Sequence, residues 1–232
     1  MGQTVFITGA GQGLGLAMAE KYLELGFMVF AGYFRHESRL DDLQTIYPEL
    51  QKVHCDVTDV KSIAAAVREV GHQVKGLDML INNAGIHTDA AFQPLENLDF
   101  VEICATFDVN TFGPLQVTKN FLKLMENGAA KLIVNISSEA GSIGDCKRRN
   151  EFGYCMSKAA LNMQSQILQN YLGPKGFKIL AVHPGWMRTA MGGAEADIDP
   201  REAAEGIVEL TRRKWEPQDG IYFDYTGKPM PW

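Results

Sequence analysis

The chain has 232 residues, of which 46% are hydrophobic and 22% charged, ordinary values for one well-buried globular domain. A formal net charge of −6 disfavours a polyanionic partner such as a nucleic acid. No apolar run reaches the length of a membrane span, and the four cysteines show neither a CxxC pair nor metal-ligand spacing. We therefore expect a cytoplasmic protein with reduced thiols and without a signal peptide, a bound metal, a membrane or a nucleic-acid partner.

Short apolar or β-branched runs alternate with helical periods along the chain. Strands are expected at 4–8, 28–33, 51–55, 77–82, 130–136, 177–183 and 221–224. Helical spacing is followed by Ile63, Val67, Val70 and Val74, and again by Ala203, Ile207 and Leu210. This alternation predicts a single α/β domain over 1–232, with about seven parallel strands in a doubly wound sheet and helices on both faces.

A glycine-rich run follows the first expected strand and leads into a helical pattern. The run is Thr8-Gly9-Ala10-Gly11-Gln12-Gly13-Leu14-Gly15. Such glycines allow a tight turn and close approach of a pyrophosphate, while the helix amino terminus supplies N–H donors. The strand–turn–helix context favours a Rossmann-type dinucleotide site over a purely structural turn. The expected cofactor contacts in the run are Gly9, Gln12, Gly13, Leu14 and Gly15.

The end of the second expected strand bears on the choice between NADP(H) and NAD(H). Dinucleotide folds often carry an acidic residue there for the adenosine ribose, but this chain has Tyr33, followed by Arg35 two residues later. The fork of donors on Arg35 suits a 2′-phosphate, so NADP(H) is favoured and NAD(H) remains possible. The alternative, equally open, is a solvated loop arginine beside His36 and Glu37.

The longest expected helical segment, 97–126, carries one polar residue on an apolar face. That face consists of Phe100, Ile103, Phe107, Asn110, Pro114, Val117 and Phe121. A buried amide needs partners, so Asn110 is either a packing anchor or part of a site. Because a helical proline cannot donate to the carbonyl four residues back, Pro114 predicts a kink with a free acceptor at Asn110.

Tyr154 and Lys158 are four residues apart on a helical stretch and therefore share one face. The same row continues inward with Leu161, Ser165, Leu168 and Leu172. A nearby cation stabilises phenolate, so Lys158 is expected to lower the pKa of Tyr154 and make it a proton carrier. The alternative is a buried tyrosine beside a snorkelling lysine.

Further motifs follow in chain order. They are Asp56-Val57 after the third strand, Asn82-Asn83-Ala84-Gly85 after the fourth, Asn110, Asn135-Ile136-Ser137-Ser138 closing the fifth, Tyr154-Cys155-Met156-Ser157-Lys158, and His183-Pro184-Gly185-Trp186-Met187-Arg188-Thr189. Together with the glycine-rich run, they resemble the short-chain dehydrogenase/reductase family in its compact single-domain form. The resemblance covers essentially the whole chain.

The resemblance implies an active site with four members. Tyr154 is the general acid/base, Lys158 tunes it and holds the nicotinamide ribose, and Ser138 binds the substrate oxygen. Asn110 holds a water that feeds protons to Lys158. Further cofactor contacts are implied for Asp56, Val57, Asn83, Ala84, Gly85, Tyr154, Lys158, Pro184, Gly185, Met187 and Thr189.

Within the family, the segment around Gly185 and the ending after Asp224 resemble the C-factor and sniffer-type carbonyl reductases. One departure is that the stretch from Ser138 to Tyr154 is a few residues longer than in the common form of the family. It carries the basic cluster Lys147-Arg148-Arg149, which is either a solvated loop or an attraction for an anionic substrate. Trp186, Met187 and Met191 form either a mobile apolar lid or ordinary packing.

The function expected from these features is NADPH-preferring reduction of a small or medium carbonyl to an alcohol. One alternative is a secondary-alcohol dehydrogenase that uses NAD+, and another is a dinucleotide-binding sensor with little turnover. Substrate loops are expected within 86–97, 139–153 and 186–200. The family tends to pair through the helices that hold Asn110 and Tyr154, so a homodimer or homotetramer is expected, although Trp232 could dock on its own subunit.

Overall fold

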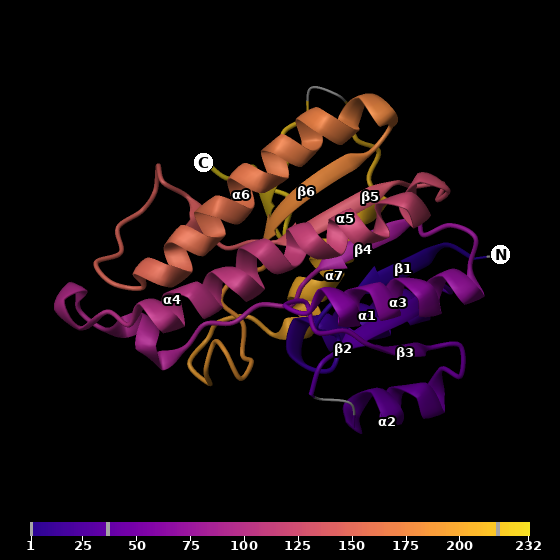
Figure 1. The fold of residues 1–232 in the computed structure, drawn as a ribbon, viewed down its shortest axis with the longest axis horizontal. Helices are drawn as coiled ribbons and strands as arrows, with labels where there is room; N and C mark the ends of the chain where they lie inside the picture. Colours follow the sequence, from indigo (N-terminus) through magenta and orange to yellow (C-terminus); the bar gives the residue numbers. More distant parts are fainter. Residues whose placement is uncertain (1, 36–37, 217–218) are drawn as a thin grey trace.

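A parallel β-sheet with helices on both faces forms the protein (Figure 1), in a computed structural model that describes residues 2–35, 38–216 and 219–232. The spatial order of the strands is β3-β2-β1-β4-β5-β6-β7, and every neighbouring pair is parallel. The strands are β1 (Thr4–Ile7), β2 (Met28–Tyr33), β3 (Gln51–His54), β4 (Met79–Asn82), β5 (Leu132–Ile136), β6 (Lys178–His183) and β7 (Tyr222–Asp224). The predicted Rossmann-type fold is confirmed, with strand ends shifted by at most two residues.

The helices form two layers. One face of the sheet is covered by α1 (Gly13–Glu24), α2 (Ser38–Ile46) and α7 (Pro200–Arg212). The other face is covered by α3 (Val60–Gln73), α4 (Phe100–Phe107), α5 (Gly113–Glu126) and α6 (Phe152–Leu172). In Figure 1, α3, α5 and α6 cross in front of the strands. Each layer buries its own apolar cluster against the sheet.

Strand β1 shows why the central strands are apolar throughout. Successive side chains of a strand point to opposite faces. Val5 and Ile7 therefore pack in the cluster with α1 and α7, whereas Phe6 packs in the cluster with α3 and α5. The Phe6 ring lies 4.4 Å from the ring of Phe121 on α5. Burial on both sides leaves no polar position in the middle of this strand.

The expected long helix is interrupted at the predicted place. A π-helical turn, Asp108–Phe112, separates α4 from α5, and Pro114 is the second residue of α5. The predicted apolar face is not buried along its whole length, because Phe100 is 71% exposed while Val117 and Phe121 are fully buried. A π turn inserts extra residues into the helical repeat, so the face before it no longer aligns with the face after it.

The carboxyl-terminal segment packs against this same chain. The Trp232 ring stacks on Tyr222 at 5.1 Å, and the Trp232 carbonyl accepts a hydrogen bond of 2.7 Å from the Gly144 amide. The expectation that Trp232 could dock on its own subunit is confirmed. The contact ties the end of the chain to the segment that follows β5.

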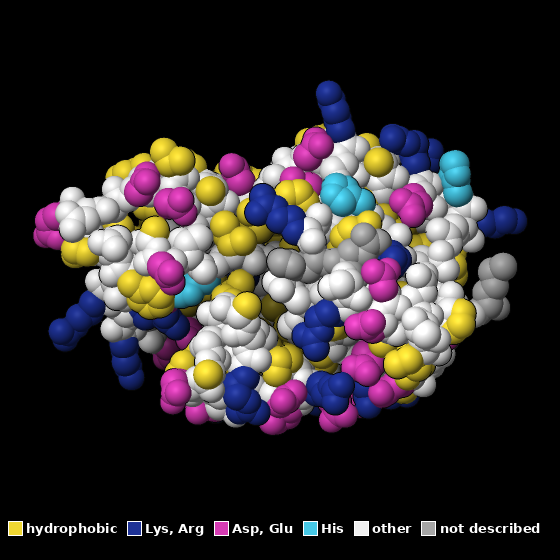
Figure 2. Space-filling model, turned by 90° about the horizontal axis from the view of Figure 1, so that it is seen from below, with side chains coloured by type: hydrophobic (Ala, Val, Ile, Leu, Met, Phe, Trp, Pro, Cys, Tyr) yellow, Lys and Arg dark blue, Asp and Glu magenta, His cyan; other side chains and the backbone are white. Residues whose placement is uncertain are grey.

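Charges of both signs are interspersed on the face shown in Figure 2, and no broad area of Lys and Arg is seen there. Over the described ranges, none of the helices combines the length and apolar character needed to span a bilayer. The same part of the chain shows no group of three or more His, Cys, Asp or Glu side chains suited to a metal ion.

Candidate active site

The motifs converge at one edge of the sheet because all seven strands run in the same direction. The glycine-rich turn follows β1, Asn83 follows β4, Ser138 follows β5 and Pro184 follows β6. The chain changes direction across the sheet between β1 and β4, and this switch point is where open α/β sheets bind ligands. The loops after β4, β5 and β6 extend from the same edge, on the left of Figure 1.

The turn after β1 requires glycine at several positions. Gly9 and Gly13 adopt positive φ values of 66° and 54°, which other residues rarely do. A Cβ on Gly15 would lie 2.3 Å from the Gly9 carbonyl oxygen and 2.5 Å from the Asn83 Nδ2 atom. The turn therefore has backbone N–H groups at the start of α1 and no side chains of its own at Gly9, Gly13 and Gly15, which fits a pyrophosphate. Gln12 is the N-cap residue of α1, and Leu14 is buried.

Asn83 and Ala84 hold this turn in place. The Asn83 side-chain amide donates to the Thr8 and Gly9 carbonyls at 2.9 and 3.1 Å. The backbone amides of Asn83 and Ala84 both donate to the Thr8 hydroxyl at 3.0 Å. The donors of the Asn83 amide are thus used inside the protein, so this side chain shapes the candidate cofactor site through the turn.

The segment after β6 covers the glycine-rich turn. A Cβ on Gly13 would lie 3.4 Å from the Thr189 Cγ2 atom, which places Thr189 directly beside the start of α1. Pro184 is buried, and Gly185 has a φ of 82° with no room for a Cβ, which would lie 2.2 Å from Ile198 Cδ1. This backbone holds Thr189 beside the glycine-rich turn, and its contact with the cofactor stays a prediction.

The three residues expected as a lid behave differently from one another. Met187 packs against the core and forms a β-bridge with Ile198. Trp186 and Met191 are about half exposed, and the Trp186 indole donates to the Gly192 carbonyl at 2.8 Å. Met187 is therefore ordinary packing, and the two exposed side chains stay available at the mouth.

The adenosine end of the expected cofactor site lies beside β2 and β3. Tyr33 is partly buried, with its ring 5.7 Å from the His54 ring. The exposed Arg35 guanidinium lies 4.7 Å from the Phe34 ring centroid. His36 and Glu37, the neighbours named in the alternative for Arg35, lie outside the described residues.

Asp56 and Val57 follow β3. The Asp56 carboxylate accepts hydrogen bonds from the amide and hydroxyl of Thr58, which close a tight turn. Val57 is buried against Gly113, whose Cβ would lie 2.9 Å from the Val57 Cγ2 atom. The turn is therefore fixed from both sides.

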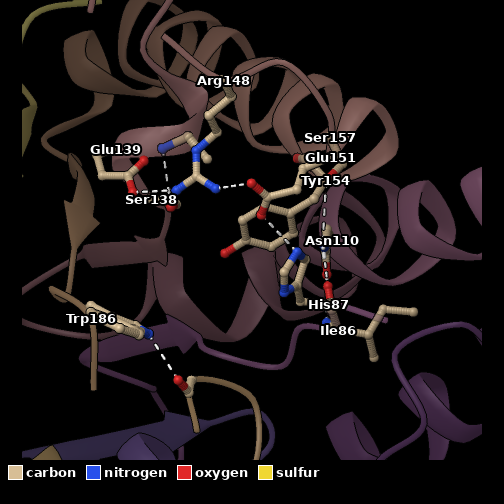
Figure 3. A network of polar contacts seen from close by, with 12 residues as sticks. Ile86, His87, Asn110, Ser138, Glu139, Arg148, Glu151, Tyr154, Ser157 and Trp186 are labelled. Carbon is tan, nitrogen blue, oxygen red and sulfur yellow. Dashed lines mark hydrogen bonds and ion pairs between the residues drawn. The ribbon is translucent and has the colours of Figure 1, made fainter. Parts of the chain in front are cut away.

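Asn110 is a fully buried anchor between three segments. Its Oδ1 atom accepts from the Ile86 amide at 2.8 Å, and its Nδ2 atom donates to the Ile86 carbonyl at 2.9 Å and to the Ser157 hydroxyl at 3.2 Å. Asn110 thus holds the chain after β4 against α6 (Figure 3). The free Asn110 carbonyl and its water stay predictions.

Lys158 is buried with one hydrogen bond to backbone. Lys158 is only 5% exposed, and its Nζ atom donates to the Ile136 carbonyl at 2.9 Å. Burial lowers the pKa of Lys158 to about 8. A Cβ on Gly85 would lie 3.8 Å from the Lys158 Nζ atom and 3.3 Å from the Asn110 Oδ1 atom, so the three residues meet.

Tyr154 shares the expected helix face with Lys158, whose Nζ atom is 5.8 Å from the phenol ring centroid. The expected lowering of the Tyr154 pKa by Lys158 is not seen in this structure. Burial raises the pKa of the phenol to about 12, and a hydrogen bond with Ser138 offsets only part of this effect. The ammonium group faces the ring and the Ile136 carbonyl, so desolvation dominates.

Ser138 is fixed from two directions. Its hydroxyl accepts from the Ala140 amide at 3.1 Å, which begins the short 3₁₀ turn Glu139–Gly141. Its carbonyl accepts a hydrogen bond of 2.7 Å from the Tyr222 hydroxyl on β7. The His183 Nδ1 atom accepts a hydrogen bond from the Glu139 amide at 3.1 Å, which is a structural contact.

The structure has an ion-pair network around Tyr154 that the sequence motifs did not predict. The Arg148 guanidinium binds the carboxylates of Glu139 and Glu151, and the Glu151 Oε1 atom lies 2.9 Å from the His87 Nε2 atom (Figure 3). The last contact has the distance of an ion pair but not the angle of an aligned hydrogen bond. The His87 ring packs 4.4 Å from the ring of Tyr154.

Arg148 is an exposed loop residue, but it is paired with two carboxylates, so its charge is not free to attract an anion. The neighbouring Lys147 and Arg149 are exposed. The signal of this network in the sequence was the extra length between Ser138 and Tyr154. Nothing in the sequence marks His87 as a neighbour of that segment. A separate cavity of about 640 Å³ lies between the end of α6 and β7, lined by residues such as Gln169, and is not part of this site.

The fold and this arrangement define the class of protein as a Rossmann-type enzyme with a dinucleotide cradle beside a Ser–Tyr–Lys group. A family model described as short chain dehydrogenase matches residues 3–199, so the chain belongs to the short-chain dehydrogenase/reductase family. The C-signal protein of Myxococcus xanthus is 34% identical over 156 residues, which is 67% of this chain and 93% of that protein.

Two solved structures superpose over the whole chain. The NADPH-bound carbonyl reductase from chicken fatty liver has a TM-score of 0.92 and 32% identity, covering 100% of this chain and 99% of its own. The carbonyl reductase Sniffer of D. melanogaster has a TM-score of 0.93 and 28% identity, covering 100% of both chains. These likenesses confirm the predicted resemblance to the C-factor and sniffer-type subgroup. The protein is an NAD(P)-dependent oxidoreductase that acts on CH–OH or C=O groups.

Proposed function

We propose that the protein reduces a small or medium uncharged carbonyl compound to an alcohol with NADPH. The observation that carries the proposal is the grouping of Ser138, Tyr154 and Lys158 at the same sheet edge as the glycine-rich turn. Bound NADPH supplies the hydride to the carbonyl carbon. The glycine-rich turn from Gly9 to Gly15 leaves its backbone open to the pyrophosphate.

Four polar residues have separate roles in protonating the substrate oxygen. Ser138 donates a hydrogen bond to it, and Tyr154 delivers a proton from its hydroxyl as charge develops. Lys158 holds the nicotinamide ribose and, once the site is filled, stabilises the phenolate that remains. Asn110 fixes the segment after β4 and carries the water that returns the proton by way of Lys158.

The raised pKa of Tyr154 is consistent with its role as proton donor in the proposed reduction. A phenol with a pKa of about 12 is fully protonated at neutral pH, as a proton donor must be. Oxidation of a secondary alcohol needs the phenolate, which burial disfavours.

A preference for NADPH is supported by two features. The end of β2 carries Tyr33 where many dinucleotide folds have an acidic residue. The exposed Arg35 guanidinium two residues later is able to pair with a 2′-phosphate. The chicken relative has NADPH bound. We infer that Asp56 and Val57 contact the adenine and that Thr189 contacts the nicotinamide carboxamide, with Ala84, Pro184 and Met187 lining the cofactor.

The assembly we propose is one domain per subunit in a cytoplasmic homodimer or homotetramer. Exposed apolar side chains on the α4 and α6 helices support pairing there. They are Phe100 and Val101 on α4, and Met156, Met163, Ile167 and Tyr171 on α6. The substrate enters between loops 86–97, 139–153 and 186–200.

The first experiment is a fluorescence titration with NADPH and NADH, followed by turnover of ketones, aldehydes and quinones. We expect tighter NADPH binding, and a loss of kcat of about 10²–10⁴ in Tyr154→Phe with unchanged NADPH affinity. The matched control is Tyr171→Phe, an exposed tyrosine on the same helix. Cofactor binding without turnover on any compound supports the sensor alternative, and absence of dinucleotide binding contradicts the proposal.

Arg35→Asp separates the two cofactors. We expect NADPH to bind about ten- to a hundredfold more weakly, because a charge-assisted contact is lost, and NADH affinity to stay unchanged. Arg39→Asp, an exposed arginine on α2, controls for net charge. Equal losses for both cofactors, or for both variants, identify Arg35 as a solvated loop residue.

A further inference from the structure

Two carboxylates flank the proposed reacting hydroxyl groups in the chain. Glu139 directly follows Ser138, and Glu151 lies three residues before Tyr154, at the N-cap of α6. Arg148 reaches both, with its NH2 atom on Glu139 and its NH1 atom on Glu151 (Figure 3). One guanidinium therefore joins the turn that carries the serine to the helix that carries the tyrosine.

The inner arm of this bridge is buried and conformationally costly. The Glu151 side chain is 8% exposed, and its backbone has a φ of 61°, a left-handed conformation that glutamate rarely adopts. The Glu151 amide also donates to the Ala91 carbonyl at 2.8 Å, which joins it to the loop after β4. Such strain persists where several contacts fix the residue, and it concentrates at functional sites.

The bridge extends through His87 to the phenol ring of Tyr154. The second Glu151 carboxylate oxygen lies beside His87, and the His87 ring packs on the Tyr154 ring. A planar guanidinium with its donors in fixed directions holds the two carboxylates in a defined geometry, which a flexible ammonium does not. Arg148 thus links the turn that carries Ser138 to the start of the helix that carries Tyr154.

We propose that Arg148 is a positioning residue, which holds the Ser138 and Tyr154 hydroxyl groups in reacting geometry through Glu139 and Glu151. This inference rests on the proposed function, because it concerns the same reaction. The extra length between Ser138 and Tyr154 is what supplies Arg148, so the longer segment is a support for the site as well as a wall of its mouth.

The bridge also sets the electrostatic surroundings of the phenol. The charged or titratable groups around it are His87 after β4, Glu139, Arg148 and Glu151 after β5, Lys158 on α6 and Tyr222 on β7. Behind the dominant effect of burial, Arg148 lowers the pKa of Tyr154 while Glu139 and Glu151 raise it. The Arg148 cation and the two carboxylates thus shift the pKa of Tyr154 in opposite directions, although together they join the same two segments.

The test uses three variants of the full-length protein with NADP+ and an alcohol that the panel identifies. We expect Arg148→Met and Arg148→Lys to lower kcat roughly ten- to a hundredfold at unchanged NADPH affinity, since the hydroxyl groups lose their alignment. We expect a smaller kcat loss for Glu139→Gln, whose side chain is 44% exposed and whose change leaves the fold intact. Lys147→Met and Arg149→Met, exposed cations of the same segment, are the matched controls.

The pH profile distinguishes positioning from a general loss of structure. Oxidation needs the phenolate, so its rate rises as pH passes the pKa of Tyr154. Arg148→Met removes a cation and moves this rise to higher pH, whereas Glu139→Gln removes an anion and moves it to lower pH. Arg148→Lys keeps the charge and the profile of the unmodified protein, although its kcat stays low.

Crystal structures of the unmodified protein and of Arg148→Met provide an arm that is independent of turnover. We expect the distance between the Ser138 Oγ and Tyr154 Oη atoms to lengthen and the 139–153 segment to shift. An unchanged distance overturns the proposal, as does a pH profile that moves in the same direction in Arg148→Met and Glu139→Gln. If the unmodified protein turns nothing over, the proposed function fails and the distance alone decides the role of Arg148.

Discussion

The glycine-rich turn after β1 and the Ser138–Tyr154 side of the site lie at the same edge of the sheet, but different interactions hold them. The turn is shaped by the absence of side chains, since a Cβ on Gly15 would contact backbone at 2.3 Å. The other side is held by the buried Lys158 and Glu151 and by Arg148, which is 31% exposed and pairs with Glu151. Close packing makes the first region rigid at little energetic cost, whereas the second retains charges that destabilise the fold.

The difference explains where errors in sequence-based prediction fall. A turn that depends on missing side chains is written in consecutive residues. A set of polar contacts depends on partners brought together from distant segments, such as His87 and Glu151. Three changes test whether the two regions differ in this way.

The largest effect is expected for Gly15→Ala. Its methyl group would displace the Gly9 carbonyl and the Asn83 amide, so we expect a loss of about 1–3 kcal/mol in stability. If the distortion falls on the bound state, NADPH binds about ten- to a hundredfold more weakly. Thermal unfolding and cofactor titration measure the two effects.

The matched control for this change is Gly71→Ala in α3, where nothing lies within 4 Å of the added Cβ. That variant is expected to gain up to about 1 kcal/mol from helix propensity. Unchanged stability and cofactor affinity in Gly15→Ala would show that backbone packing does not define the turn.

An intermediate effect is expected for Lys158→Met. The pKa of Lys158 is lowered by burial to about 8 from a model-compound value of 10.5. Below pH 8 the lysine is charged in both states, so the folded protein bears the full desolvation penalty. Removing it is expected to raise the free energy of unfolding by on the order of 2 kcal/mol at pH 7 while turnover is lost.

The sign of this effect follows from proton binding. Between pH 8 and 10.5 the unfolded chain binds more protons than the folded one, so the unmodified protein gains stability as pH rises. The advantage of Lys158→Met should shrink over that range. Urea unfolding at several pH values measures it, and a constant difference between the two proteins contradicts the idea of a costly buried cation.

The smallest effect is expected for Lys131→Gly. Lys131 has a φ of 51° just before β5, where a glycine relieves the left-handed strain. After the greater chain entropy of glycine is deducted, we expect a gain of about 0.5–1 kcal/mol without change in activity. Glu151→Gly relieves similar strain at a φ of 61° but removes the partner of Arg148, so its turnover should fall. Equal behaviour of both variants would show that the strain at Glu151 has no special role.

Much of the molecule is determined by the sequence over short distances. The seven apolar runs become the seven strands because burial on both faces needs continuous apolar sequence. The glycines after β1 are placed by local geometry, and the four-residue spacing of Tyr154 and Lys158 puts them on one helix face. Each of these features needs only neighbouring residues and a regular repeat.

Tertiary structure decides the rest. The exposure of Phe100 follows from a π turn that shifts the register between α4 and α5. The pKa of Tyr154 rises instead of falling, because the desolvation of a phenol depends on everything that surrounds it. The pairing of Arg148 with Glu139 and Glu151 depends on where β5 and α6 place three side chains in space. Electrostatic and packing energies act between atoms that are close in space, and sequence separation alone does not give those distances.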